Sequence, residues 1–417
     1  MIILWEELSC LSSKKFNCTH FLCKLLVVLL FYSLLGSISP VFIFWIVNCF
    51  SNESPTYGHS LFPNFGNPFR MVSPNRSSDQ PAKLNRVLNA FEDSLTRRLK
   101  QLEPKMMKDM INLSWMQLAM GVLSATHADL KSLITDLQFP VTEWDEKWMD
   151  EYLDDTVKLL DICLALNVEI SKLEHFQLLV HYVLHLLDFS DGVWSNDKLF
   201  RAKGSLQELK EKMALKGKNG VNSQRNSKIE NCSVILQRMS KSLQFGKVKS
   251  SSKGRVFLRA MYGVKATTIF LCSVVASSLA GHPGPLIELR VPDQFLWSTA
   301  FTRLQRRING EIKRCFASDR VLVVKELEML DAAIKNVHPI VESLSPADIV
   351  DGTEKVEQIR IAIQELQQSV QLLAQGLDPL SKQVNDFFHV ILSGRNALLD
   401  SLRMPPVQSK PIRHNQS

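Results

Sequence analysis

Apolar residues recur every three or four positions along most of this chain, and that spacing restricts the chain to helices. The longest such stretch runs from Thr142 to Asp188, where Thr142 can cap the helix and acidic residues fill its first turn. Six of its apolar residues should share one face: Met149, Leu153, Val157, Leu160, Leu164 and Val168. Alternation with a period of two, which indicates strands, is scarce. We therefore expect an all-α protein.

Stretches with the same spacing lie on both sides of the central one. They predict helices over 81–104, 113–137, 197–214, 229–243, 254–280, 293–316 and 318–337. We expect about eight to ten helices in an elongated multi-helix bundle with long antiparallel helices. This helical domain should occupy 81–402. It should contain a flexible loop at 216–228 and be followed by a disordered tail at 403–417.

The most regular apolar repeat lies near the carboxyl end of the chain. It alternates intervals of three and four through Val356, Ile359, Ile363, Leu366, Val370, Leu373, Leu377, Leu380, Val384, Phe387 and Ile391. Gly376, Asp378 and Pro379 interrupt it with a stop signal. The pattern predicts two helices or one sharply kinked helix. Their apolar face forms either a seam inside the bundle or a dimerising coiled coil.

Residues 1–57 differ from the rest of the chain. The uncharged segment 25–50 is long enough to span a bilayer, and lysines before it would place the amino terminus in the cytosol. That topology conflicts with four cysteines that suit a reducing compartment: Cys163, Cys232, Cys272 and Cys315. Three interpretations remain open: a membrane anchor, an extension absent from the mature protein, or a signal peptide. A Gly/Pro/Asn/Ser linker should follow at 58–80.

Three patterns could indicate a metal site, and we favour a structural interpretation of each. One is an acidic cluster: Glu143, Asp145, Glu146, Asp150, Glu151, Asp154 and Asp155. The second is a histidine group: His175, His181 and His185, with Asp188 one turn on. The third, His127, lies on an apolar stripe and should be a hydrogen-bonded core residue. We expect no metal and no cofactor.

Positive charge is concentrated between Lys198 and Lys265, where 17 Lys and Arg stand against three acids. The net charge of the whole chain is only +7. Candidate contacts with an anionic membrane are Lys247, Lys249, Lys253, Arg255, Arg259 and Lys265. The apolar run 266–279 that follows suits a buried core helix better than a spanning one. A solvated basic face is the alternative, and the chain lacks motifs that would favour nucleic acid.

The chain contains no Gly-rich phosphate loop, no G-x-S-x-G and no Cys/His pair at a catalytic spacing. We therefore expect that it is not an enzyme and that it has no catalytic residues.

Several segments in order resemble the plant Bypass family between about residues 62 and 340. They include FGNPFRMVSP (65–74), LSWMQLAM (113–120), THADLKSLITDLQFPVTEWDEKWMDEYLD (126–154), VKLLDIC (157–163), IENC (229–232), KGRVFLRAMYGVK (253–265) and VLVVKELEMLD (321–331). The resemblance implies a helical plant protein with no known enzymatic activity. It also implies a role in root and shoot development, in which the family restrains a root-derived mobile compound that arrests shoot growth.

Residue pattern and resemblance together predict a non-enzymatic developmental regulator at a membrane surface. The alternatives are a helical adaptor in vesicle tethering or trafficking, and an enzyme acting on a precursor of the mobile compound. Partners should be an anionic membrane surface and proteins bound through helix faces, and the oligomeric state stays open. Localisation should be membrane if the segment 25–50 is retained, and otherwise cytoplasmic or peripheral. A plastid is less favoured because residues 1–57 lack the Arg/Ser-rich character of a transit peptide.

Overall fold

The structure is a computed structural model that describes residues 79–103, 111–137, 146–188, 195–217, 228–244, 252–281, 287–317, 324–344 and 354–403. The chain divides into two units, Met1–Pro74 and Asn75–Ser417, and every described residue belongs to the second. The predicted membrane segment 25–50, most of the linker and of the loop at 216–228, and nearly all of the tail lie outside the described residues.

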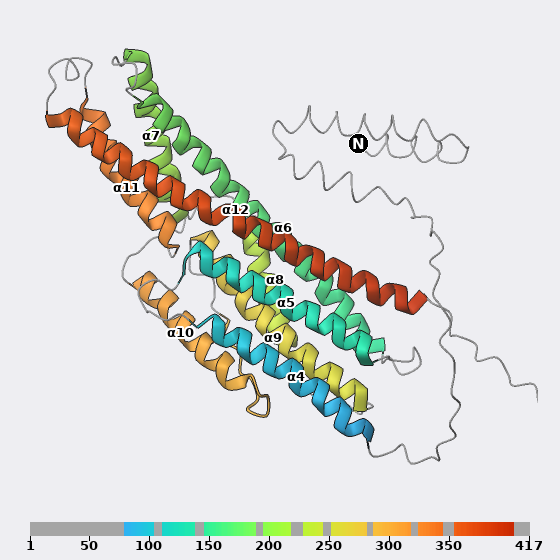
Figure 1. Ribbon diagram of the computed structural model, residues 1–417. Helices are drawn as coiled ribbons and strands as arrows, with labels where there is room; N and C mark the ends of the chain where they lie inside the picture. The colour runs from blue at the N-terminus through green and yellow to red at the C-terminus, as the bar shows by residue number, and fades with distance from the viewer. Residues whose placement is uncertain are drawn as a thin grey trace, which may run out of the picture. The chain divides into compact units, whose positions relative to one another are not determined.

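The described residues form helices and no strand, which confirms the predicted all-α bundle (Figure 1). The helices are α4 (Asp79–Gln101), α5 (Leu113–Leu137), α6 (Glu146–Leu186), α7 (Asn196–Gly217), α8 (Lys228–Ser242), α9 (Ser252–Ala280), α10 (Ser298–Ala317), α11 (Lys325–Ser343) and α12 (Glu354–Arg403).

Helix α9 forms the centre of the core. Every residue from Tyr262 to Leu279 is buried, and α4, α5, α6 and α8 pack around it. The helix is long and apolar enough to cross a membrane, but 94% of its apolar window is covered by the rest of the bundle. The prediction of a buried core helix over this apolar run is therefore confirmed. Burying so much apolar surface in one element supplies a large share of the driving force for folding.

Helix α12 is one continuous helix of 50 residues, so the predicted break into two helices is wrong. Its apolar repeat packs between α5 and α6, and Leu373, Leu377 and Leu380 are fully buried. The interpretation of this repeat as a seam within the bundle is confirmed. Pro379 costs the helix one backbone hydrogen bond, and tertiary packing on both sides of the interruption holds the helix together.

Gly376 has a packing role in place of the predicted stop. A Cβ atom at this position would lie 2.7 Å from both Cβ and Cδ1 of Leu113 on α5. Only glycine permits two helices to approach this closely without a shift.

Side-chain hydrogen bonds give the directions of the two helices beside α12. Gln383 and Ser393 bond to Ser124 and Lys131 of α5, so α5 and α12 run parallel. Asn385 and Arg395 bond to Asn167 and to the carbonyl of Leu153 on α6, so α6 and α12 run antiparallel.

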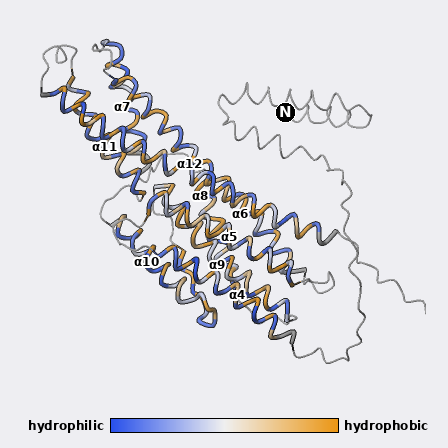
Figure 2. The backbone as a smooth tube through the Cα atoms, viewed as in Figure 1, coloured by the Kyte–Doolittle hydropathy of each residue, from blue (hydrophilic) through white to orange (hydrophobic). Residues whose placement is uncertain are grey.

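Helix α6 presents a different face to the core from the one predicted. Val157 and Leu164 of the predicted stripe are exposed, and its other members are only half-buried. The buried face instead carries Leu159, Ile162, Cys163, Leu166, Ile170 and Leu173. Apolar residues occur on more than one side of this helix, so periodicity could not identify the inner side (Figure 2).

The described part of the connection between α9 and α10, residues 287–297, packs against the bundle. Gln305 binds Leu289 through two 3.0 Å hydrogen bonds, accepting from its N–H and donating to its carbonyl. Further on, the N–H of Leu296 donates to Glu92 on α4, and the Phe295 ring stacks on Tyr262 of α9. This segment fixes where α10 begins, five residues later than predicted.

Candidate functional site

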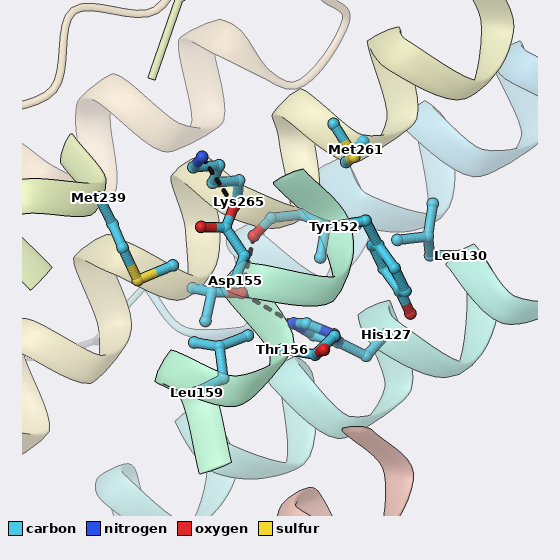
Figure 3. Close-up of a pocket in the computed structure, with 11 residues that line it drawn as sticks. His127, Leu130, Tyr152, Asp155, Thr156, Leu159, Met239, Met261 and Lys265 are labelled. Carbon is cyan, nitrogen blue, oxygen red and sulfur yellow. Dashed lines mark hydrogen bonds and ion pairs between the residues drawn. The ribbon is translucent and has the colours of Figure 1, made fainter. Parts of the chain in front are cut away.

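The bundle has a polar centre built around Lys265 of α9. Its ammonium group lies 2.7 Å from Glu151 and 2.7 Å from Asp155, both on α6. Figure 3 shows the pair with Asp155. Only 7% of Lys265 is exposed. The prediction that Lys265 contacts a membrane is therefore wrong: a buried ammonium needs anionic partners, and two members of the acidic cluster supply them.

A small pocket of about 30 Å³ lies beside this ion pair. It is lined from four helices by His127, Leu130, Tyr152, Asp155, Thr156, Leu159, Met239, Met261, Val264, Lys265 and Thr268. Figure 3 shows His127 and Lys265 approaching it from different helices. Its volume is about that of a single water molecule, and organic ligands occupy pockets of roughly 300 Å³ or more.

His127 is a hydrogen-bonded core histidine, as predicted. Its Nε2 lies 3.0 Å from the hydroxyl of Thr268, which itself donates to the carbonyl of Val264. The hydroxyl must therefore accept from His127, which places the imidazole proton on Nε2. Burial lowers the pKa of His127 to about 4, so the ring is neutral near pH 7.

Arg395 and Tyr152 also contribute to the packing of the polar centre. Arg395 of α12 donates to the carbonyl of Leu153 at 2.6 Å and to the hydroxyl of Thr156 at 3.0 Å. Burial raises the pKa of Tyr152 to about 12, although nearby Arg395 lowers it, so the phenol stays protonated. Near pH 7 the phenol and the imidazole of the centre are therefore both neutral, and Lys265 is held between two carboxylates.

Arg259, a second predicted membrane contact, is half-buried and bound to other parts of the bundle. Its guanidinium binds Glu92 of α4, a side chain only 1% exposed, and donates to the carbonyl of Gln294 at 2.7 Å. It also lies 4.9 Å from the centre of the Phe295 ring. This prediction is wrong because Arg259 neutralises a buried carboxylate and fixes the segment before α10.

Two of the six predicted membrane contacts remain near the surface at the start of α9. Arg255 is exposed and donates to Ser252 at 3.2 Å, and Lys253 is half-buried. Lys247 and Lys249 lie outside the described residues.

The candidate histidine ligands of α6, and Asp188 just beyond its end, are solvent-facing. His175, His181, His185 and Asp188 are all exposed, and within the described part of the chain no three ligand-type residues converge for a metal ion. The four described cysteines are buried and form no disulfide, as predicted for core thiols. Burial raises the pKa of Cys232 to about 12 and that of Cys272 well above its ordinary value, which makes both thiols unreactive.

Two surface features escaped the sequence analysis. Helix α6 leaves Val157, Leu164, Leu178 and Tyr182 exposed along one side. Helix α10 carries five cations toward solvent: Arg303, Arg306, Arg307, Lys313 and Arg314. Their helical spacing is readable from the sequence.

Comparison with known proteins identifies relatives over most of the chain. A family model described as Protein ROH1-like matches residues 67–256 and 255–402. Protein BPS1, chloroplastic, from Arabidopsis thaliana is 38% identical, covering 82% of this chain and 90% of that protein. UPF0496 protein 4 from Oryza sativa subsp. japonica is 33% identical, covering 84% and 97%. Protein ROH1D from Arabidopsis thaliana is 20% identical, covering 76% and 88%. No solved structure matches.

The word chloroplastic in the name of the BPS1 relative weighs against our expectation that a plastid is the less favoured location. The matches extend across nearly all the described helices and confirm the resemblance to the Bypass family. The chain therefore belongs to the plant family of ROH1-like and Bypass proteins.

Proposed function

We propose that this chain is a non-enzymatic developmental regulator of the Bypass type that acts at a membrane surface. Its family membership supports the regulatory role. In that role it restrains production of a root-derived mobile signal that arrests shoot growth.

The observation that carries the non-enzymatic part is the condition of the polar centre. Lys265 is neutralised by two carboxylates, His127 is neutral and hydrogen-bonded, and the adjoining pocket holds about one water molecule. Catalytic sites need a free acid, base or nucleophile beside a space for substrate. Here the buried polar groups stabilise the packing of α9 against α5 and α6.

The membrane part is supported by the cations at the start of α9. Arg255 is exposed at the start of α9, and Lys253 and Arg255 follow Lys247 and Lys249 in sequence. Clustered cations next to a folded domain attract anionic lipid headgroups.

The test is flotation of the full chain with vesicles, comparing phosphatidylcholine alone with mixtures containing phosphatidylserine. The variant reverses four charges: Lys247→Glu, Lys249→Glu, Lys253→Glu and Arg255→Glu. We expect it to lose the additional binding that phosphatidylserine provides. A control with four reversals elsewhere should keep it: Lys210→Glu, Lys212→Glu, Arg360→Glu and Lys382→Glu. Equal binding by wild type and the first variant would exclude this contact.

A helical adaptor is a second candidate function, favoured by the exposed apolar side of α6. Val157, Leu164, Leu178 and Tyr182 are 45%, 36%, 64% and 43% exposed, and their spacing places them within about 60° of one another around the helix. An apolar helix side of this kind suits docking of a partner helix.

The adaptor function predicts that Leu164→Ser with Leu178→Ser removes stoichiometric protein partners without lowering the melting temperature. Exposed residues of α12 give a matched control, Ile361→Ser with Leu372→Ser, since they are 51% and 42% exposed. Affinity purification from plant membranes with quantitative mass spectrometry provides the measurement. Retention of every partner by the α6 variant argues against the adaptor.

A further inference from the structure

The outward side of α10 carries an uninterrupted set of cations. At 100° per residue, Arg303, Arg306, Arg307, Lys313 and Arg314 fall within about 120° of the helix circumference and extend over about 17 Å. We call these five residues the α10 cationic face. Thr299, Thr302 and Gly310 share the same side. The helix contains one acid, Glu311, which is 8% exposed and forms an ion pair with Arg314.

Acids of the bundle position this face without cancelling it. Glu103, two residues beyond α4, binds both Arg303 and Arg307, and Lys313 pairs with Glu288 in a bridge whose two side chains are more than 60% exposed. An exposed pair such as Lys313–Glu288 is weak in water, so an external anion can replace Glu288. Arg306 is exposed and makes no ion pair or hydrogen bond among the described residues.

The position of α10 makes the face accessible. The helix packs against α4 at one edge of the bundle (Figure 1). Leu296 lies just before its first turn and is 51% exposed, and its backbone N–H donates to Glu92. A row of cations with an exposed leucine at one end suits the boundary between lipid headgroups and acyl chains.

We propose that the α10 cationic face docks onto anionic phospholipid headgroups, with Leu296 entering the interface. This deepens the proposed membrane function by naming a surface separate from the start of α9. Lipid is favoured over nucleic acid because the face has no aromatic side chain to stack on bases. The face is also the convex side of a helix, a shape that does not enclose a nucleic-acid strand.

The experiment measures partitioning of the full chain onto vesicles of phosphatidylcholine with 30% phosphatidylserine, about 0.1 M salt being present in all samples. Arg306→Glu with Lys313→Glu should lower the phosphatidylserine-dependent partition coefficient about tenfold or more. Arg306→Lys with Lys313→Arg should retain it, because the charge is preserved. Arg360→Glu with Lys382→Glu on α12 has the same net charge as the first variant and should bind as wild type does.

The possible results distinguish binding through the α10 cationic face from membrane binding in general. If wild type gains nothing from phosphatidylserine, both the membrane function and this surface are excluded. If wild type gains binding and the Arg306→Glu/Lys313→Glu variant gains as much, the α10 face alone is excluded. A 20-base-pair duplex tested in parallel settles the class of partner: loss of duplex binding with unchanged vesicle binding assigns the face to nucleic acid and overturns the proposal. Circular dichroism and melting temperature confirm that the variants fold.

Discussion

Individual buried polar residues determine how the helices of this protein meet. Lys265 joins α9 to α6, His127 joins α5 to α9, and Arg259 joins α9 to α4. Each is satisfied by a named partner, so each selects one arrangement among the many that apolar packing alone would allow.

His127 should make stability depend on pH in a predictable direction. Its pKa is about 4 in the folded protein and 6.5 ordinarily, so between these values the unfolded chain takes up a proton that the folded chain does not. The contribution of neutral, buried His127 to the free energy of unfolding is fully present above pH 6.5 and is lost as the pH falls toward 4. Lowering the pH from 7.5 to 5 should therefore cost wild type about 2 kcal/mol more than His127→Gln.

Urea unfolding of both proteins at the two pH values provides the measurement. The difference between them isolates His127, because the carboxylates that titrate in this range are common to both. An identical loss of stability in both would show that the imidazole is not buried in its neutral form.

At the scale of helices, Gly376 permits α12 to approach α5 closely and does not interrupt α12. Replacing it with alanine introduces a methyl group 2.7 Å from two atoms of Leu113. We expect Gly376→Ala to destabilise the protein by about 1–3 kcal/mol, although alanine is the better helix former.

Gly204 on α7 is the matched control, because a Cβ atom there meets nothing within 4 Å. Gly204→Ala should raise stability by about 0.5–1 kcal/mol. Thermal unfolding distinguishes the two changes. Equal stabilisation by both would rule out the close contact, and adding Leu113→Ala to Gly376→Ala should recover part of the loss.

The helices also differ in how well the sequence predicts which of their sides is buried. The stripes of α4 and α5 were predictable because each helix has one strongly apolar side, and Leu95, Leu99, Met116 and Met120 are fully buried. The buried side of α6 could not be predicted in this way, because the helix buries Asp155, Thr156 and Glu169 while exposing Val157 and Leu164. The identity of its inner side depends on Lys265, which lies more than a hundred residues further along the chain.

The polar centre could not be predicted from the sequence either, because its residues come from distant parts of the chain. Glu151, Asp155 and Lys265 each appeared as members of larger charged clusters, and no local pattern pairs a carboxylate on one helix with an ammonium on another. The class of the fold, in contrast, was predictable because apolar periodicity is a local property.

At the scale of the described bundle, the last helix completes surfaces formed by much earlier parts of the chain. Helix α12 covers α5 and α6 through contacts such as Gln383 with Ser124 and Arg395 with Leu153. Synthesis on the ribosome proceeds at about 5–20 residues per second, so more than ten seconds separate the emergence of the two sides of this interface. During that interval the nascent chain presents unsatisfied apolar surface to the cytosol. We therefore expect ribosome-associated chaperones to engage the chain from the emergence of α5 until α12 has been released.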